Sequence, residues 1–338
     1  MRRRVAMIMP VYNEARHLPE VLSSIALQLF DHDRLSLIVV DGNSSDGSAE
    51  IAKAWFTGAD IAGCVLTNPR RKIPIALNLA LRHVSEDDII LRLDAHTLYG
   101  PTYVADAVRA LSAAPANVAC IGGAHLPMPG TSFEERVVEA LYTNPLGLGG
   151  ADFRLGDDIR ETDSVYLGAW RPGILVRAGG FNETMEANED GELAARVRKM
   201  GYRLLRVPLP CRFLIKRGVW ASIRQWNRYG FWRAKMLQRQ PQFIRMRHVA
   251  SPAGVLVTLT LLCSSWRMLL LPAFCLYALF VFHGRAKDEP LLVTLASLGF
   301  FPAVQFAWGL GMLAGIVTGP GCAWPPLRSR TASAQMRS

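Results

Sequence analysis

Acidic side chains are missing from a long stretch of this 338-residue sequence: no Asp or Glu occurs between Glu192 and Asp288. Residues 196–247 of this stretch carry fifteen Lys and Arg side chains, and the formal net charge of the whole chain is +10. Such a basic run can bind nucleic acid, but this one leads directly into an apolar segment, where basic side chains attract anionic lipid head groups. We therefore expect anionic membrane lipids, and no nucleic acid, as the partner of this stretch.

The six cysteines form no Cys-X-X-Cys pair, and Cys263 and Cys275 fall inside apolar segments. This scatter excludes a disulfide framework and a cysteine-based zinc site, and it indicates a reducing compartment. The apolar run that ends before Asn13 is too short for the core of a signal peptide and is typical of a first β-strand.

Charge is almost absent from two long stretches near the C-terminus. Arg267 is the only charged residue in 252–282, and residues 290–318 contain none. The second stretch exceeds the roughly 20 residues that span a bilayer. The first is either one tilted span or two short helices broken near 264–267. The alternative for both stretches is the core of a soluble protein, which we consider the weaker interpretation.

The charges that flank these stretches predict their orientation. The tail, residues 319–338, is basic and contains no acid, so the positive-inside rule places it and the N-terminal domain in the cytoplasm. An even number of spans satisfies this, and we expect a multi-pass protein of the inner (cytoplasmic) membrane, with a helical hairpin whose turn at 283–289 faces outward. The predicted regions are a catalytic domain with a basic juxtamembrane helix at 1–248, about two spans at 249–318, and the tail. Gly311, Gly315 and Gly319 lie four apart and allow close contact between helices.

In the N-terminal part, apolar runs bounded by turn residues alternate with helical patterns. Strands are predicted at 5–9, 35–40, 61–66 and 88–93, and helices at 15–30, 48–56, 73–84, 189–200 and 222–238. This alternation indicates βαβ units and a mostly parallel sheet with helices on both faces. Ligands of such sheets bind at the carboxyl ends of the strands. Pro10, Asp41 and Asp94 each follow a predicted strand, so we expect them to converge on one crevice.

Five polar motifs follow one another along the chain: VYNE at 11–14, VVDGNSSDGS at 39–48, RLDAH at 92–96, NEDGELAARVRKMGYR at 188–203 and QWNRYGFWRAK at 225–235. Their order resembles that of the family 2 glycosyltransferases, and with the C-terminal hairpin it is similar to the succinoglycan-type enzymes of exopolysaccharide biosynthesis. The resemblance implies an α/β GT-A fold, the Rossmann-like mixed sheet of nucleotide-diphospho-sugar transferases, followed by a transmembrane helical hairpin.

The resemblance also implies a site for a nucleotide-sugar donor. Residues matching Pro10 and Tyr12 lie along the base in the family, and those matching Glu14 and Asp41 bind the ribose or uracil. Carboxylates suit this role because they are strong hydrogen-bond acceptors. The wider donor set includes Asp46, Arg71 and Asp94. For residues 41–48 the alternative is a plain turn with a helix N-cap, and for Arg71 it is a solvated charge cluster.

In the family, a pair of Asp residues separated by one position binds a divalent metal; here the pair is Asp94 and His96. A metal stabilises the charge that develops on the leaving diphosphate. The imidazole shifts the preference from Mg²⁺ toward Mn²⁺. The alternative is that His96 is a polar loop residue with no ligand role.

The resemblance assigns the catalytic base to Asp190, next to Glu189. An inverting transfer needs such a base to take the proton of the acceptor hydroxyl. Two carboxylates at a helix N-terminus are also favoured by the helix dipole alone, which is the alternative. Gln225, Arg228 and Tyr229 resemble a family element near the acceptor and diphosphate, with a basic helix on lipid as the alternative. Trp170 is a further candidate for the acceptor pocket.

These observations predict an inverting hexosyltransferase that moves a sugar, with UDP as the favoured nucleotide, onto a polyprenyl-diphosphate-linked saccharide. A nucleotidyltransferase is the first alternative, but the glycine-rich phosphate loop it needs is missing after the first strand. The second is a nucleotide-sugar-binding membrane scaffold that has lost catalysis through His96. The sequence leaves open the sugar, the linkage and whether transfer is processive.

Overall fold

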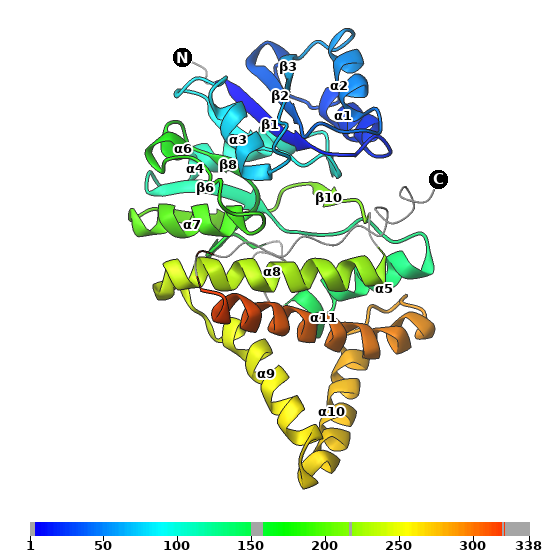
Figure 1. Cartoon of the computed structure of the whole chain (residues 1–338). Helices are drawn as coiled ribbons and strands as arrows, with labels where there is room; N and C mark the ends of the chain where they lie inside the picture. The colour runs from blue at the N-terminus through cyan, green and yellow to red at the C-terminus, as the bar shows by residue number, and fades with distance from the viewer. Residues whose placement is uncertain (1–3, 150–157, 216–217, 320, 322–338) are drawn as a thin grey trace, which may run out of the picture.

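The computed structural model describes residues 4–149, 158–215, 218–319 and 321. Figure 1 shows a sheet-containing body that rests on a helical base, from which two helices project as a V. The strands are β1 (Val5–Val11), β2 (Leu35–Asp41), β3 (Ala62–Thr67), β4 (Ile89–Arg92), β5 (Thr97–Tyr99), β6 (Val118–Gly123), β7 (Arg160–Thr162), β8 (Tyr166–Trp170), β9 (Arg203–Arg206) and β10 (Cys211–Phe213).

The helices of the sheet-containing body are α1 (Leu18–Ala26), α2 (Ser48–Phe56), α3 (Ile73–Leu81), α4 (Tyr103–Ala113), α5 (Phe133–Thr143), α6 (Ile174–Arg177) and α7 (Glu189–Lys199), with the short turns η1 (His32–Arg34) and η2 (Pro145–Gly149). The C-terminal helices are α8 (Val219–Arg239), α9 (Met246–Leu262), α10 (Leu270–His283) and α11 (Leu291–Val317), with the short turns η3 (Pro241–Phe243) and η4 (Ser265–Leu269). The predicted helix at 15–30 is shorter than expected, because Gln28 leaves the helix and its side chain bonds the backbone at Gly100 and Val104.

The main sheet is mixed, as predicted, with the strand order β3-β2-β1-β4-β8-β6-β9-β7. Strands β1 to β4 are mutually parallel, whereas β8 runs antiparallel to both β4 and β6. Val11 pairs with Asp41, and Ile8 pairs with Arg92. The carboxyl ends of β1, β2 and β4 therefore meet at one edge, which confirms the predicted convergence of their polar residues.

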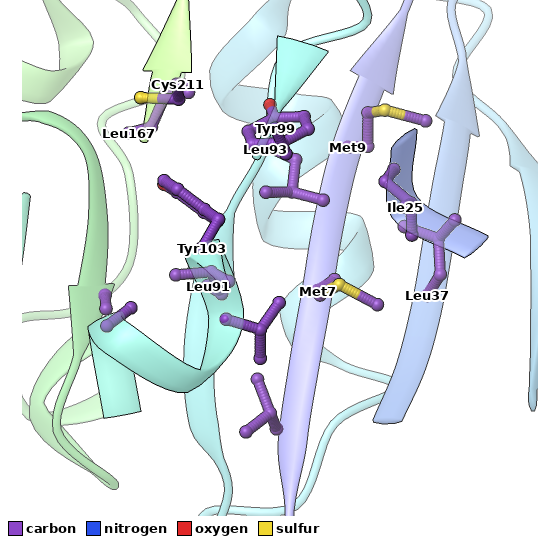
Figure 2. Close-up of a cluster of buried hydrophobic side chains, with 14 of the residues drawn as sticks. Met7, Met9, Ile25, Leu37, Leu91, Leu93, Tyr99, Tyr103, Leu167 and Cys211 are labelled. Carbon is purple, nitrogen blue, oxygen red and sulfur yellow. The ribbon is translucent and has the colours of Figure 1, made fainter. Parts of the chain in front are cut away.

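Helices cover both faces of the sheet because its strands are apolar on both sides. Along β1, Met7 and Met9 face one layer, which includes Ile25 of α1 and Tyr103 of α4 (Figure 2). Ile8 faces the other layer, formed by α3, α6 and α7. Both layers are fully buried, so the strands read as continuous apolar runs.

A third hydrophobic cluster joins the sheet-containing body to the C-terminal helices. It includes Leu141 of α5, Trp226 of α8, Val281 of α10, and Phe301 and Val304 of α11. These side chains lie on both sides of the predicted domain boundary at residue 248. The C-terminal helices therefore share a core with the sheet-containing body.

Two helical segments are long and apolar enough to cross a membrane by length and composition: Ser265–His283 and Leu291–Val317. They fit a hairpin connected at 284–290, in which the Tyr277 hydroxyl donates a hydrogen bond of 3.3 Å to the carbonyl oxygen of Ser297. The first apolar stretch is not one helix. It bends at η4 into α9 and α10, which is the broken alternative left open by the sequence (Figure 1).

Helix α11 packs lengthwise against α8 through glycines. A Cβ atom on Gly230 of α8 would overlap the carbonyl oxygen of Trp308, and one on Gly311 of α11 would overlap that of Asn227. Gly315 also packs tightly, against Ala234 and the backbone of α8, whereas Gly319 has a positive φ of 65° just past the helix end and no close neighbour. The close contact predicted for Gly311 and Gly315 is therefore present, with α8 as the partner. The basic tail beyond residue 321 lies outside the described residues.

Candidate active site

One cavity of about 930 Å³ lies between the carboxyl edge of the sheet and the helices α8, α9 and α11. Most of the residues singled out in the sequence line it. They are Pro10, Tyr12, Glu14, Arg71, Asp94, His96, Trp170, Glu189, Asp190, Gln225, Arg228 and Tyr229. Asp41 and Asp46 lie beside the cavity but are not among its lining residues.

Tyr12 and Arg71 form the outer wall at the strand ends. The Arg71 guanidinium lies 5.5 Å from the centre of the Tyr12 ring, and its Nη1 donates a hydrogen bond of 3.4 Å to the Tyr12 hydroxyl. Tyr12 is 45% exposed, so the ring remains accessible. Arg71 has a positive φ of 58°, a conformation that is uncommon for a residue with a side chain and that clusters at functional sites. This pair offers an aromatic ring and a cation to a nucleotide.

Asp41 ends β2 beneath this pair and is buried. Its Oδ2 accepts a hydrogen bond of 3.0 Å from the backbone N–H of Ser44. Its Oδ1 is buried and has no hydrogen-bond partner among the described residues. A buried carboxylate oxygen without a partner is costly, and a ligand hydroxyl or N–H would satisfy it.

Asp46 instead braces two loops. Its Oδ2 accepts from the backbone N–H of Ala15 at 2.9 Å, and its Oδ1 accepts from the Ser48 hydroxyl at 2.6 Å. The Ser48 hydroxyl oxygen in turn accepts from the backbone N–H of Glu14 at 2.8 Å. These contacts correspond to the turn alternative for Asp46, and they fix Glu14 at the cavity wall.

Asp94 and His96 follow β4 at the floor of the donor end. The Asp94 backbone N–H donates to the Tyr99 hydroxyl at 2.8 Å, and His96 Nδ1 lies 3.7 Å from Glu14 Oε1. In the described part of the chain, no group of three or more His, Cys, Asp or Glu side chains is placed to hold a metal. Divalent cations at phosphate sites commonly take only one or two protein ligands and complete their coordination with substrate phosphates. Asp94 and His96 fit that arrangement.

Arg92 connects the two acidic parts of the site, and the sequence reasoning gave it no role. Its Nη2 lies 3.0 Å from Glu189 Oε1 and 3.7 Å from Asp94 Oδ1. Burial alone would lower the pKa of Arg92, but the carboxylates of Glu189, Asp94 and Asp190 raise it, so Arg92 stays charged. In the sequence, the feature that could have pointed to Arg92 is its position as a lone cation at the end of the apolar strand β4.

Glu189 and Asp190 begin α7 at the middle of the cavity. Burial raises the pKa of Glu189; the Arg92 charge opposes this rise, and the Asp190 charge adds to it. Asp190 Oδ1 accepts a hydrogen bond of 2.7 Å from the backbone N–H of Gly191. The two adjacent carboxylates therefore differ in environment, because Glu189 is buried against a cation and Asp190 is exposed.

Asn188 holds this helix end against α8. It has a positive φ of 59°, its Nδ2 donates to the carbonyl oxygen of Tyr229 at 3.0 Å, and its Oδ1 accepts from Arg233 Nη2 at 3.1 Å. The position of the Glu189–Asp190 pair is thus set by α8. The sequence singled out Asn188 only as part of a motif, and Arg233 also went without a role.

The element predicted to lie near the acceptor, which contains Gln225, Arg228 and Tyr229, is on α8 opposite Asp190. Gln225 Nε2 donates a hydrogen bond of 2.7 Å to the Tyr229 hydroxyl, one turn along the helix. Arg228 lines the same wall. The element therefore presents a cation and an aromatic hydroxyl to the cavity.

The cavity continues past Asp190 to an apolar end that the sequence did not reveal. This end is lined by Leu146 and Leu148 of η2, His248 and Ser251 of α9, and Val304, Gln305 and Trp308 of α11. Gln305 Oε1 accepts from the Ser251 hydroxyl at 2.8 Å, and its Nε2 donates to the carbonyl oxygen of Gly147 at 2.8 Å. The α11 residues lie in a segment whose apolar composition predicts only a membrane helix, so no local pattern marks them as lining.

Residues 6–140 match the model of Glycosyl transferase family 2. The chain is 28% identical over 198 residues to the succinoglycan biosynthesis protein ExoA of Rhizobium meliloti (strain 1021), and the alignment covers 58% of each chain. It is 38% identical over 56 residues to the glycosyltransferase AglE of Haloferax volcanii, covering 17% of this chain and 18% of the relative. The aligned part is thus little more than half the length of the first relative.

The structure is similar to that of a mannosyltransferase from Pyrobaculum calidifontis in complex with GDP-Man and Mn²⁺, with a TM-score of 0.61 and 22% sequence identity. The similarity covers 93% of this chain and 88% of that one. At this identity it establishes the fold, which is the predicted GT-A-like mixed sheet. Residues 6–140 are therefore similar to a family 2 glycosyltransferase domain.

Proposed function

We propose that the protein is an inverting glycosyltransferase that moves a sugar from a nucleotide-sugar to a saccharide carried on a membrane lipid diphosphate, in the assembly of an exopolysaccharide or another cell-surface glycan. The observation that carries this proposal is the single cavity, which joins the strand ends, the Glu189–Asp190 pair and an apolar end beside α9 and α11. The similarity to ExoA supports the polysaccharide class.

At the donor end, the base of the nucleotide stacks on the Tyr12 ring, and Asp41 Oδ1 accepts a hydrogen bond from the ribose or base. The cation of Arg71 lies over the same ring and faces the phosphates. The similar mannosyltransferase structure contains GDP-Man, and the name of ExoA specifies no nucleotide. The choice of UDP, which the sequence favours, is therefore part of the proposal.

In the transfer step, an oxygen of the Asp190 carboxylate takes the proton of the acceptor hydroxyl while the hydroxyl oxygen attacks the anomeric carbon. The bond from that carbon to the diphosphate oxygen breaks, and the nucleoside diphosphate leaves with the electron pair. Because attack and departure occur on opposite sides of the carbon, the anomeric configuration inverts. Arg228 faces the leaving diphosphate, which its planar fork of donors can bind in a bidentate manner.

Glu189 and Arg92 hold the base in place. The Arg92–Glu189 pair fixes the first turn of α7 against β4, so Asp190 keeps its position relative to Asp94. The Arg92 charge also opposes the rise in the pKa of Glu189 that burial causes, which favours the ionised form of Glu189 beside Asp190.

Asp94 and His96 are the residues that would hold a divalent metal. When bound, such a metal supplies Lewis-acid stabilisation to the leaving diphosphate. The Mn²⁺ in the similar mannosyltransferase structure supports this assignment, and an imidazole ligand favours Mn²⁺ at least as much as Mg²⁺.

The proposed location is the cytoplasmic face of the inner membrane. The two apolar segments of sufficient length support membrane association, and the basic stretch from 196 to 247 supports contact with anionic lipids. A lipid-linked acceptor fits the apolar end of the cavity, which is lined by α9 and α11.

The test is to incubate membranes that contain the protein with labelled nucleotide-sugars and lipid-linked acceptors. Asp190→Asn should lower transfer by about 10²- to 10⁴-fold, the range for loss of a general base, and leave donor binding within about twofold. Asp60→Asn, at an exposed site far from the cavity, is the matched control and should be fully active. An Asp190→Asn variant that keeps most of its transfer activity would rule out the assigned base.

A further inference from the structure

The connection between α10 and α11 lies against the catalytic domain. The Asn144 side chain, at the end of α5, donates a hydrogen bond of 3.2 Å from Nδ2 to the carbonyl oxygen of Val281. A Cβ atom on Gly284 would lie 3.1 Å from both Asn144 and Pro145. The connection at 284–290 therefore sits on the side of the molecule that carries the active site.

Helix α11 is bonded to α8 over much of its length. Asn227 Nδ2 donates to the carbonyl oxygen of Ala307 at 2.6 Å, and Gln238 Nε2 donates to that of Ile316 at 2.9 Å. The buried Lys235 donates to the Thr318 hydroxyl at 2.7 Å. Together with the glycine contacts, these bonds hold α11 alongside α8, and both helices lie across the base of the catalytic body (Figure 1).

Helices α9 and α10 are different, because they project away from that base (Figure 1) and most of their apolar side chains are exposed. The exposed large side chains include Leu256, Val257, Leu259 and Leu262 of α9, and Leu271, Phe274, Leu276, Leu279 and Phe280 of α10. A surface this apolar, on two helices at once, fits the hydrocarbon of a bilayer.

We infer that α9 and α10 form the membrane-inserted hairpin, with the bend at 263–269 pointing away from the catalytic side. The connection at 284–290 and helix α11 stay on the catalytic side, where α11 lies along the membrane surface beneath α8. The end that points away from the cytoplasm is then 263–269, and the turn at 283–289 does not face outward as the charge pattern alone predicts.

The two arms are long enough to enter the hydrocarbon deeply. Helix α9 has 17 residues and helix α10 has 14, which correspond to about 26 Å and 21 Å at 1.5 Å per residue. The hydrocarbon core is about 30 Å thick. The bend carries Trp266 and Arg267, both exposed, and these residue types are typical of the interface between hydrocarbon and water.

A membrane crossing by α11 is energetically unfavourable because α11 is bonded to the basic helix α8. Helix α8 carries the cations Arg224, Arg228, Arg233, Lys235 and Arg239, and α11 is bonded to it from Asn227 to Gln238. Drawing α11 through the bilayer would draw this basic helix into hydrocarbon, where charged side chains are strongly disfavoured. Lying flat, α11 exposes Leu310 and Ile316 to lipid and keeps its other face on α8.

The test uses the full-length protein in membrane vesicles of both orientations, with a membrane-impermeant maleimide and mass spectrometry to identify each labelled cysteine. The variants are Lys287→Cys in the connection and Trp266→Cys in the bend, and Thr57→Cys on the catalytic domain defines the catalytic side; all three positions are exposed. Detergent-solubilised protein provides the full labelling value for each cysteine.

Lys287→Cys should be labelled from the same side as Thr57→Cys, to within about twofold of its value in detergent. Trp266→Cys should resist the reagent from that side at least about tenfold, and react either from the opposite side or only after detergent is added. Labelling of Lys287→Cys only from the opposite side, its protection in both orientations, or labelling of Trp266→Cys from the catalytic side would overturn the inference. None of these outcomes depends on sugar transfer, so failure here leaves the proposed function intact.

Discussion

The two ends of the cavity are built in different ways. The donor end consists of loops that follow neighbouring parallel strands, and it is polar, with Tyr12, Glu14 and Asp94 close to buried β-structure. The opposite end consists of helix faces, from η2, α9 and α11, and is mostly apolar. The comparison teaches that a sheet edge fixes the proposed nucleotide site by topology, whereas the proposed acceptor site depends on how separate helices pack.

The largest effect should come from the donor end. Chelation of divalent metal should abolish transfer, and Mn²⁺ should restore it at least as well as Mg²⁺. His96→Asp, which supplies a second carboxylate, should shift the preference toward Mg²⁺ because hard oxygen ligands suit that ion. The measurement is the initial rate against each metal concentration. Full turnover in chelator would break the assignment of Asp94 and His96.

Gly311→Leu is expected to have a large effect on stability and on acceptor use, confined to the helical end of the cavity. The added side chain would overlap the backbone of α8 at Asn227, and overpacking of this kind costs about 1–3 kcal/mol. We expect a lower melting temperature in detergent and weaker acceptor use, with donor binding preserved. Gly299→Leu, on the same helix with no close neighbour, is the control. Equal melting temperatures for the two variants would contradict the close packing.

A smaller effect, specific to the donor end, should follow from Tyr12→Ala. Loss of ring stacking is worth about 0.5–1.5 kcal/mol, which corresponds to a roughly 2- to 13-fold rise in the donor KM with a similar kcat. Tyr12→Phe keeps the ring, loses only the hydroxyl that accepts from Arg71, and should remain close to wild type. An acceptor KM that rises as much as the donor KM would remove the distinction between the two ends.

The smallest effect should be a shift of the pH profile in Arg92→Met. The Arg92 charge lowers the pKa of Glu189 against the effect of burial, so its removal raises that pKa further. A protonated Glu189 then persists to higher pH beside Asp190, and the acidic limb of kcat/KM should move to higher pH. Arg92→Lys keeps the charge and should shift the limb less. An unchanged limb in Arg92→Met would show that Glu189 does not affect the reaction through its charge.

The sequence predicted that Asp41 and Asp94 lie at one edge of the sheet, because both follow apolar runs typical of buried parallel strands. It did not predict Arg92 or Asn188, since their roles depend on contacts with residues far along the chain. Asp46 is the opposite example. It lies in a motif and was predicted to bind the donor, but its carboxylate accepts hydrogen bonds from the backbone N–H of Ala15 and from the Ser48 hydroxyl. The lining residue Trp308 was not predicted because its segment carries only the composition of a membrane helix.

Asn188 has a consequence for regulation by the lipid environment. It couples the start of α7 to the carbonyl oxygen of Tyr229 and to Arg233, while the opposite side of α8 rests on α11. We expect a change in bilayer thickness or curvature that tilts α11 to displace α8, and with it Asn188 and the start of α7. On the proposed mechanism, the transfer rate would then depend on the membrane even when nucleotide-sugar and acceptor are both saturating.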